Sequence, residues 1–138
     1  MAVKPILLDT NAYAAFKRGM PDAVELIRHA SHIGISVVVL GELFGGFALG
    51  SREQRNREEL SAFLKSSRVQ VFTITPETSE HYGLVYQELK RRGKPIELSD
   101  IPMTEAVSLK DKFVICTDKT YKTTGRKLNS VFIDTGEN

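Results

Sequence analysis

The stretch ILLDTN, Ile6–Asn11, contains the pattern from which the fold of this chain is predicted. Its apolar half, Ile6–Leu8, suits a short buried strand, and Asp-Thr-Asn is typical of the turn or helix cap that follows one. Asp9 is therefore expected at the carboxyl end of a strand. Near the other end of the chain, the stretch FVICTD, Phe113–Asp118, repeats this pattern of an apolar strand that leads to an aspartate.

Strand and helix patterns alternate between these two stretches. Strands are predicted at 6–8, 33–37, 69–74 and 113–116, with 36 as the alternative end of the second strand and 131–133 as a candidate fifth. Helices are predicted at 12–16, 21–31, 38–49, 52–65, 76–92 and 100–109. Ser51 is the predicted cap of the fourth helix, and the fifth helix should bury Tyr82, Val85, Tyr86 and Leu89. The alternation predicts an α/β three-layer sandwich around a mainly parallel sheet of four to five strands.

The composition is that of an ordinary globular protein. A chain of 138 residues with 41% hydrophobic and 26% charged residues fits one domain, expected at 1–134 with a short tail at 135–138. The single cysteine, Cys116, excludes an intrachain disulfide framework and a multi-cysteine zinc site. His29 and His32 share a predicted helix end, but nothing places His81 beside them, so a histidine zinc site is not expected. We find no signal-peptide pattern and no membrane-span pattern, so a cytoplasmic protein is expected. A net charge of +2 says little about nucleic-acid binding.

The stretch SVVVLGELFGGF, Ser36–Phe47, places one carboxylate in an apolar run. An ionised Glu42 has to face solvent, pair with another group or bind a cation, because burying it alone is costly. Its apolar neighbours recur at helical spacing, and an exposed Glu42 is hard to reconcile with so many apolar residues close by. We therefore predict that Glu42 has a partner. Gly45 and Gly46 are expected to let this helix pack closely.

Four acidic residues should converge on one edge of the sheet. In open parallel sheets, sites form at the carboxyl ends of the strands, near the point where the strand order reverses. Asp9 and Asp118 follow strands, Asp100 begins a helix, and Glu42 lies about one helical turn beyond the second strand. Taken singly, Asp9 and Asp100 have an alternative role as helix caps, and Asp118 as the start of a turn.

Converging carboxylates favour a hard divalent cation, because they repel one another unless a proton or a cation lies between them. Oxygen ligands suit Mg²⁺ or Mn²⁺ rather than zinc. Such an ion can polarise a phosphodiester and lower the pKa of a bound water. The acids therefore favour metal-dependent phosphodiester hydrolysis.

With these blocks in order, the chain resembles the PIN-domain nucleases, and within them the VapC-type toxins of prokaryotic toxin–antitoxin pairs. The resemblance rests on ILLDTNAYAAFKRG, VVLGELFGG, YQELKRRGKPIELSDIPMTEA and FVICTDKTY, which span nearly the full length. It implies an endoribonuclease that depends on Mg²⁺ or Mn²⁺ and commonly cleaves tRNA or rRNA. It also implies a homodimer that is neutralised by a VapB-type antitoxin.

The resemblance also assigns roles to residues. It implies that the metal is held by the four acids, which are Asp9, Glu42, Asp100 and Asp118. The supporting residues would be Thr10, Asn11 and Thr117, with the Thr10 hydroxyl available to hydrogen-bond within the site. The basic candidates for RNA contact are Arg91, Arg92, Lys94 and Lys119, for which a solvated helix end or loop is the alternative interpretation.

Other classes of function remain as alternatives. The chain could be a non-catalytic α/β binding module in which the acids cap helices, or a PIN-type RNA-processing nuclease outside a toxin–antitoxin system. A phosphatase that uses Asp9 as its nucleophile fits poorly, because the haloacid-dehalogenase pattern needs a second aspartate where this chain has Asn11.

Overall fold

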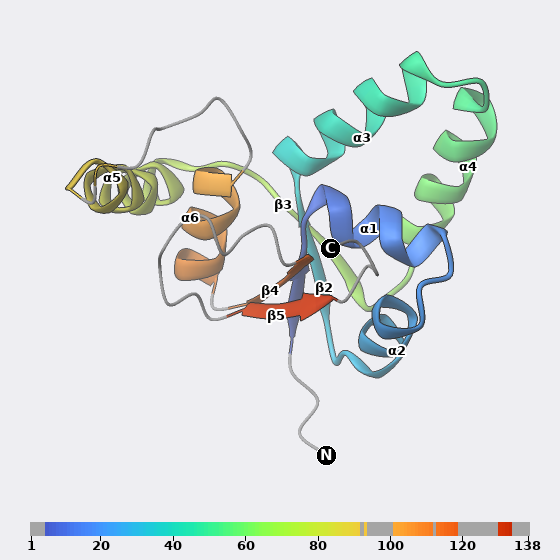
Figure 1. Cartoon of the computed structure of the whole chain (residues 1–138), viewed down its shortest axis with the longest axis horizontal. Helices are drawn as coiled ribbons and strands as arrows, with labels where there is room; N and C mark the ends of the chain where they lie inside the picture. Colours follow the sequence, from blue (N-terminus) through green and yellow to red (C-terminus); the bar gives the residue numbers. More distant parts are fainter. Residues whose placement is uncertain (1–4, 92, 94–100, 112, 119–129, 134–138) are drawn as a thin grey trace.

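Parallel strands form the centre of the protein (Figure 1). The computed structural model describes residues 5–91, 93, 101–111, 113–118 and 130–133. Within them, the strands are β1 (Ile6–Leu8), β2 (Ile33–Ser36), β3 (Val69–Phe72), β4 (Val114–Asp118) and β5 (Ser130–Ile133). They lie in the order β3-β2-β1-β4-β5, and each neighbouring pair is parallel. The predicted parallel sheet is confirmed.

Helices cover both faces of this sheet. They are α1 (Thr10–Lys17), α2 (Pro21–His29), α3 (Val37–Leu49), α4 (Glu53–Leu64), α5 (Pro76–Arg91) and α6 (Ile101–Asp111). Ile6 and Leu8 belong to the cluster that packs against α1 and α2, whereas Leu7 packs with Val107 of α6 on the other face. Figure 1 shows α1 and α2 on one side of the sheet and α5 and α6 on the other. The predicted three-layer sandwich is therefore confirmed.

The strand order reverses next to β1. The chain passes from β1 to β2 and β3 in one direction, and β4 and β5 lie on the opposite side of β1. Leu8 at the end of β1 is in register with Cys116 of β4. The backbone of Asp9 and the last residue of β4, Asp118, consequently lie at the same edge, where α/β sheets place their sites.

Some local predictions from the sequence are wrong. Strand β3 ends at Phe72 rather than at residue 74. The N-cap of α4 is Arg52, with no side-chain capping bond, so Ser51 does not cap this helix. On α5, Val85 is fully buried as predicted, but Tyr86 is 45% exposed. The Leu89 side chain lies outside the described part of the structure.

Gly34 shows how closely the sheet packs against its covering side chains. A Cβ atom at this position would overlap the ring of Phe72 and would lie 3.1 Å from the ring of Phe113. These two rings meet edge to face, with their centroids 5.0 Å apart. The absence of a side chain at Gly34 therefore lets two aromatic rings lie directly on β2.

Among the described residues, no helix combines the length and the hydrophobicity that crossing a membrane requires.

Candidate functional site

Asp9 lies directly after β1 and begins α1. Its Oδ1 atom accepts a hydrogen bond of 2.6 Å from the backbone N–H of Ala12, and its side chain is almost completely buried. This is the capping role that the sequence left open, and the partial positive charge at the start of α1 stabilises the carboxylate there. The backbone N–H of Asp9 also donates to the carbonyl of Cys116 at 3.4 Å, which ties the residue to β4.

Glu42 is partnered, as predicted, but it is exposed. Its Oε1 atom accepts a hydrogen bond of 2.8 Å from the hydroxyl of Thr10, the first residue of α1. The helix that carries Glu42 begins directly after β2, where Ser36 caps it by accepting from the N–H of Val39 at 3.3 Å. Two helices that start at neighbouring strand ends therefore bring Thr10 and Glu42 into contact.

Glu42 is exposed because α3 extends away from the sheet. In Figure 1, α3 and α4 form a hairpin that reaches beyond α1. Only part of the surface of α3 is covered, with Val39 and Leu43 buried. A Cβ atom at Gly45 or Gly46 would meet nothing within 4 Å, so the expected close packing at these two glycines is wrong.

The remaining predicted site residues are placed only in part. Thr117 and Asp118 are the last two residues of β4, at the edge of the sheet where Asp9 lies, and only their backbone is described. Asn11 is exposed on α1. Arg91 ends α5 and pairs with Glu88 at 2.6 Å. Four predicted residues lie outside the described residues: Asp100, Arg92, Lys94 and Lys119.

Cys116 lies near Asp9, but its thiol does not act as a metal ligand as the carboxylates can. Burial, and to a smaller degree the charge of Asp9, raise the pKa of its thiol to about 12. The thiol therefore stays protonated at neutral pH, whereas a metal ligand or a nucleophile has to be a thiolate. Oxygen atoms remain as the donors at this edge.

The donors that the structure places here fit a hard cation. Asp9 and Glu42 offer carboxylate oxygens and Thr10 a hydroxyl oxygen, which is the chemistry that Mg²⁺ and Mn²⁺ prefer. Within the described residues, no group of three or more His, Cys, Asp or Glu side chains is close enough to hold a metal ion. A metal site therefore needs further ligands, and the sequence predicts Asp100 and Asp118 for this role.

Reasoning from the sequence missed two features of the helices α1 and α3, which carry these residues. Ser36, the cap of α3, has a recognisable signal because a serine directly precedes an apolar helical run. An ion pair between Lys17 and Glu59, 2.9 Å long, joins α1 to α4. Lys17, together with Arg55, also lowers the pKa of Glu59 through hydrogen bonds, so this carboxylate remains ionised. Nothing in the sequence pairs residues so far apart.

The chain matches known proteins over most of its length. A family model described as "PIN domain" matches residues 6–122. Ribonuclease VapC2 of Haemophilus influenzae is 28% identical over 97 residues, which are 69% of this chain and 72% of that protein.

Two solved structures show the same fold. One is DNA-bound VapBC from Salmonella typhimurium, with a TM-score of 0.75 and 24% identity over 95% of this chain and 97% of the matched chain. The other is VapBC2 from Rickettsia felis bound to a fragment of promoter DNA, with a TM-score of 0.74 and 23% identity over 93% of this chain and 96% of the matched chain.

Proposed function

The chain belongs to the PIN-domain family, and from this premise we propose that it is a VapC-type toxin, an endoribonuclease that hydrolyses phosphodiester bonds in structured RNA such as tRNA or rRNA. The similarity to the VapC2 ribonuclease supports the reaction class. The observation that carries the proposal is the Thr10–Glu42 hydrogen bond, because it joins a second carboxylate to the strand end that bears Asp9.

We propose that Mg²⁺ is held by the carboxylates of Asp9, Glu42, Asp100 and Asp118, with Mn²⁺ as a substitute. When bound, the ion supplies the Lewis acidity that phosphodiester hydrolysis at neutral pH requires. The protein's own contribution is orientation. The cap bond to Ala12 holds Asp9, and the Thr10 hydroxyl occupies one of the two oxygens of Glu42.

Burial also strengthens the charge interactions of the Asp9 carboxylate. Asp9 is 1% exposed, so water screens its charge little, and charge interactions there are stronger than in water. Basic residues would receive the RNA backbone: we propose phosphate contacts for Arg91, Arg92, Lys94 and Lys119. Arg91 is already ion-paired, and a phosphate has to compete with Glu88 for its guanidinium.

The partner we propose is a VapB-type antitoxin that neutralises the enzyme. The support is that both structures named above are VapBC assemblies. We also propose that the free protein is a homodimer. Light scattering of the purified chain measures the second claim directly, and a mass equal to that of the monomer at micromolar concentration contradicts it.

The experiment that tests the function is inducible expression followed by mapping of new RNA 5′ ends. Wild type is compared with Asp9→Asn, because Asn caps a helix as well as Asp does but carries no charge. We expect discrete new 5′ ends with wild type and none with the variant. Equal cleavage by both proteins contradicts the assignment of Asp9, and the absence of new ends with wild type contradicts the function.

A further inference from the structure

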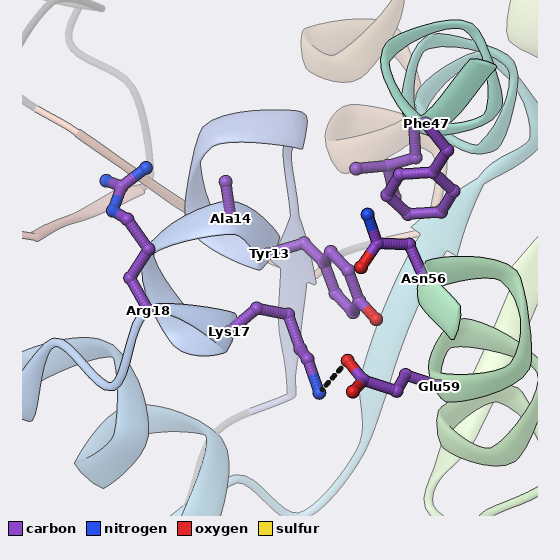
Figure 2. Close-up of a pocket in the computed structure, with 8 residues that line it drawn as sticks. Tyr13, Ala14, Lys17, Arg18, Phe47, Asn56 and Glu59 are labelled. Carbon is purple, nitrogen blue, oxygen red and sulfur yellow. Dashed lines mark ion pairs between the residues drawn. The ribbon is translucent and has the colours of Figure 1, made fainter. Parts of the chain in front are cut away.

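Among the described residues, two buried hydroxyl groups have no hydrogen-bond partner, those of Tyr13 and Thr104. The ring of Tyr13 accounts for its burial, because it packs edge to face on Phe63 with the ring centroids 5.4 Å apart. Figure 2 shows this side chain between α1 and α4. Thr104 has no ring to bury, and a buried hydroxyl without a partner is uncommon. Its hydroxyl therefore needs another explanation.

Thr104 lies on the face of α6 that packs against the sheet. Its side chain is 1% exposed, and it lies three residues before Val107, which packs with Leu7 of β1. It also lies four residues before Ser108, whose hydroxyl donates to the carbonyl of Phe113 at 2.6 Å. Residues three and four apart share one face of a helix, so both contacts place Thr104 towards the sheet.

The first turn of α6 lies at the edge of the sheet that carries the acids. Ser108, near the end of the helix, contacts Phe113 just before β4 begins, and β4 then runs to Asp118. The helix and the strand are therefore antiparallel, and α6 begins at the carboxyl ends of the strands. Because α6 begins at Ile101, Thr104 is on this first turn, and helical side chains tilt towards the N-terminus.

Asp9 carries its carboxylate on the same side of the sheet. Side chains two residues apart on an extended chain point the same way, and Leu7 packs on α6. Asp9 continues the extended backbone of β1, with φ of −92° and ψ of 178°. From the packed pair of Leu7 and Val107, Asp9 is about 6.6 Å further towards the edge and Thr104 about 4.5 Å. The two residues are therefore neighbours at this edge.

A hydroxyl donor fits the chemistry of a metal-binding carboxylate. An ionised carboxylate has about four acceptor sites, so Asp9 can accept hydrogen bonds besides the one from Ala12. Hydrogen bonds from outer groups fix the direction of a ligand carboxylate and raise metal affinity. Threonine has two favoured side-chain rotamers in a helix, so its hydroxyl can turn towards an acceptor without strain.

We propose that Thr104 is a positioning residue of the metal site, and that its hydroxyl donates to the Asp9 carboxylate that binds the cation. The inference rests on the proposed function and adds one residue to its site. A carboxylate that accepts this hydrogen bond gives the buried hydroxyl its partner and is held in a fixed direction at the same time.

Thr104→Val tests this role, because valine keeps the branched shape and replaces the hydroxyl with a methyl group. Mn²⁺ is titrated into the purified full chain in a calorimeter. The Kd for Mn²⁺ should rise about 10-fold in Thr104→Val, the effect of removing a group that orients a metal ligand. Thr104→Ala also lacks the hydroxyl and should show the same rise. Thr104→Ser keeps the hydroxyl and should bind Mn²⁺ as tightly as wild type does.

Urea unfolding in the presence of a chelator separates this role from a structural one. Thr104→Val should unfold at the same urea concentration as wild type or at a higher one, because it removes a buried hydroxyl that has no partner in the described structure. A lower midpoint together with an unchanged Kd for Mn²⁺ indicates that the hydroxyl bonds a backbone carbonyl of its own helix. This result overturns the proposal.

Ser108→Ala is the matched control on the same face of α6. It removes a hydroxyl that is bonded to Phe113, so it should lower the urea midpoint and leave the Kd for Mn²⁺ unchanged. The opposite responses expected of Ser108→Ala and Thr104→Val distinguish a structural hydroxyl from a positioning one. A rise in the Kd for Mn²⁺ of the same size in both variants overturns the proposal, because any loss of a hydroxyl on α6 then has this effect.

Asp9→Asn distinguishes failure of this inference from failure of the proposed function. It should bind Mn²⁺ about 10-fold or more weakly than wild type. If it does, and Thr104→Val binds Mn²⁺ as tightly as wild type, the role of Thr104 is overturned and the proposed nuclease stands. If wild type and Asp9→Asn bind Mn²⁺ equally, or neither binds it at millimolar concentration, the proposed metal site is overturned together with this inference.

Discussion

Thr10 and Glu42 are 32 positions apart in sequence, yet the Thr10 hydroxyl donates a hydrogen bond of 2.8 Å to the Glu42 carboxylate. The first residue of α1 and a residue on the second turn of α3 meet because both helices begin at neighbouring strand ends. The contact fixes the direction of a carboxylate that is otherwise exposed. Substitutions that break this contact can therefore test the role of Glu42 at the sheet edge without disturbing the core.

Thr10→Val should lower kcat/KM for RNA cleavage about 10-fold, because groups that orient a ligand contribute about 10- to 100-fold to activity or metal affinity. Valine keeps the branched shape of threonine and removes only the hydroxyl. Thr10→Ser restores the hydroxyl and should recover most of the rate. An equal rate for all three proteins in a cleavage assay contradicts the orienting role.

Glu42→Gln should weaken Mn²⁺ binding about 10-fold or more, measured by calorimetry, while the midpoint of urea unfolding stays near the wild-type value. The amide oxygen can still accept from Thr10, and the exposed position makes the loss of charge harmless to folding. Glu58→Gln on α4 is the matched control. An unchanged affinity together with lost stability supports a purely structural pairing instead.

Tyr13 should give the protein a stability that declines at alkaline pH. Its pKa is about 12 in the folded protein against 10.0 for an unperturbed tyrosine, so the unfolded chain loses the proton first. This contribution is complete below pH 10 and disappears as the pH rises towards 12. Tyr13→Phe should remove this part of the decline and cost little at pH 7, where the lost hydroxyl has no partner among the described residues. Urea unfolding at pH 7 and between pH 10 and 12 measures both effects, and an identical decline in the variant contradicts them.

Two glycine substitutions should change stability in opposite directions. Gly34→Ala forces a methyl group against the rings of Phe72 and Phe113 and should destabilise the protein by about 1–3 kcal/mol. Gly45→Ala adds a methyl group in open space on a helix and should stabilise it by up to about 1 kcal/mol. Thermal unfolding of both variants measures these two effects. A shift of Tm in the same direction for both variants contradicts the prediction.

The sequence predicts the sheet well because strand signals are local. Ile6–Leu8 and Ile33–Ser36 are short apolar runs with turn signals, and parallel pairing follows from the helices between them. Asp9 could be placed at a strand end for the same reason. Long-range partners carry no such signal, so the sequence indicates that Glu42 needs a partner but cannot identify it as Thr10.

The wrong predictions share a physical cause. Periodicity shows which residues lie on one face of a helix, but not whether another element covers that face. Tyr86 lies close to the buried Val85 and is nevertheless 45% exposed. Glu42 has apolar neighbours in sequence, but it is exposed on the hairpin that α3 and α4 form. Gly45 and Gly46 suggest close packing only if something packs against them, and nothing lies within 4 Å of the Cβ positions there.

The central claim is that Asp9 acts through its charge in RNA cleavage and not only as a helix cap. The most direct measurement is the Mg²⁺-dependent cleavage rate of a mapped RNA substrate by purified wild type, Asp9→Asn and the exposed control Asp22→Asn. Because asparagine preserves the cap to Ala12, all three proteins should fold alike. We predict that the cleavage rate falls roughly 100-fold or more for Asp9→Asn, which is at or above the upper end of the effect of removing a residue that only orients a metal ligand. The control should cleave at the wild-type rate. Cleavage by Asp9→Asn at the wild-type rate would contradict the account.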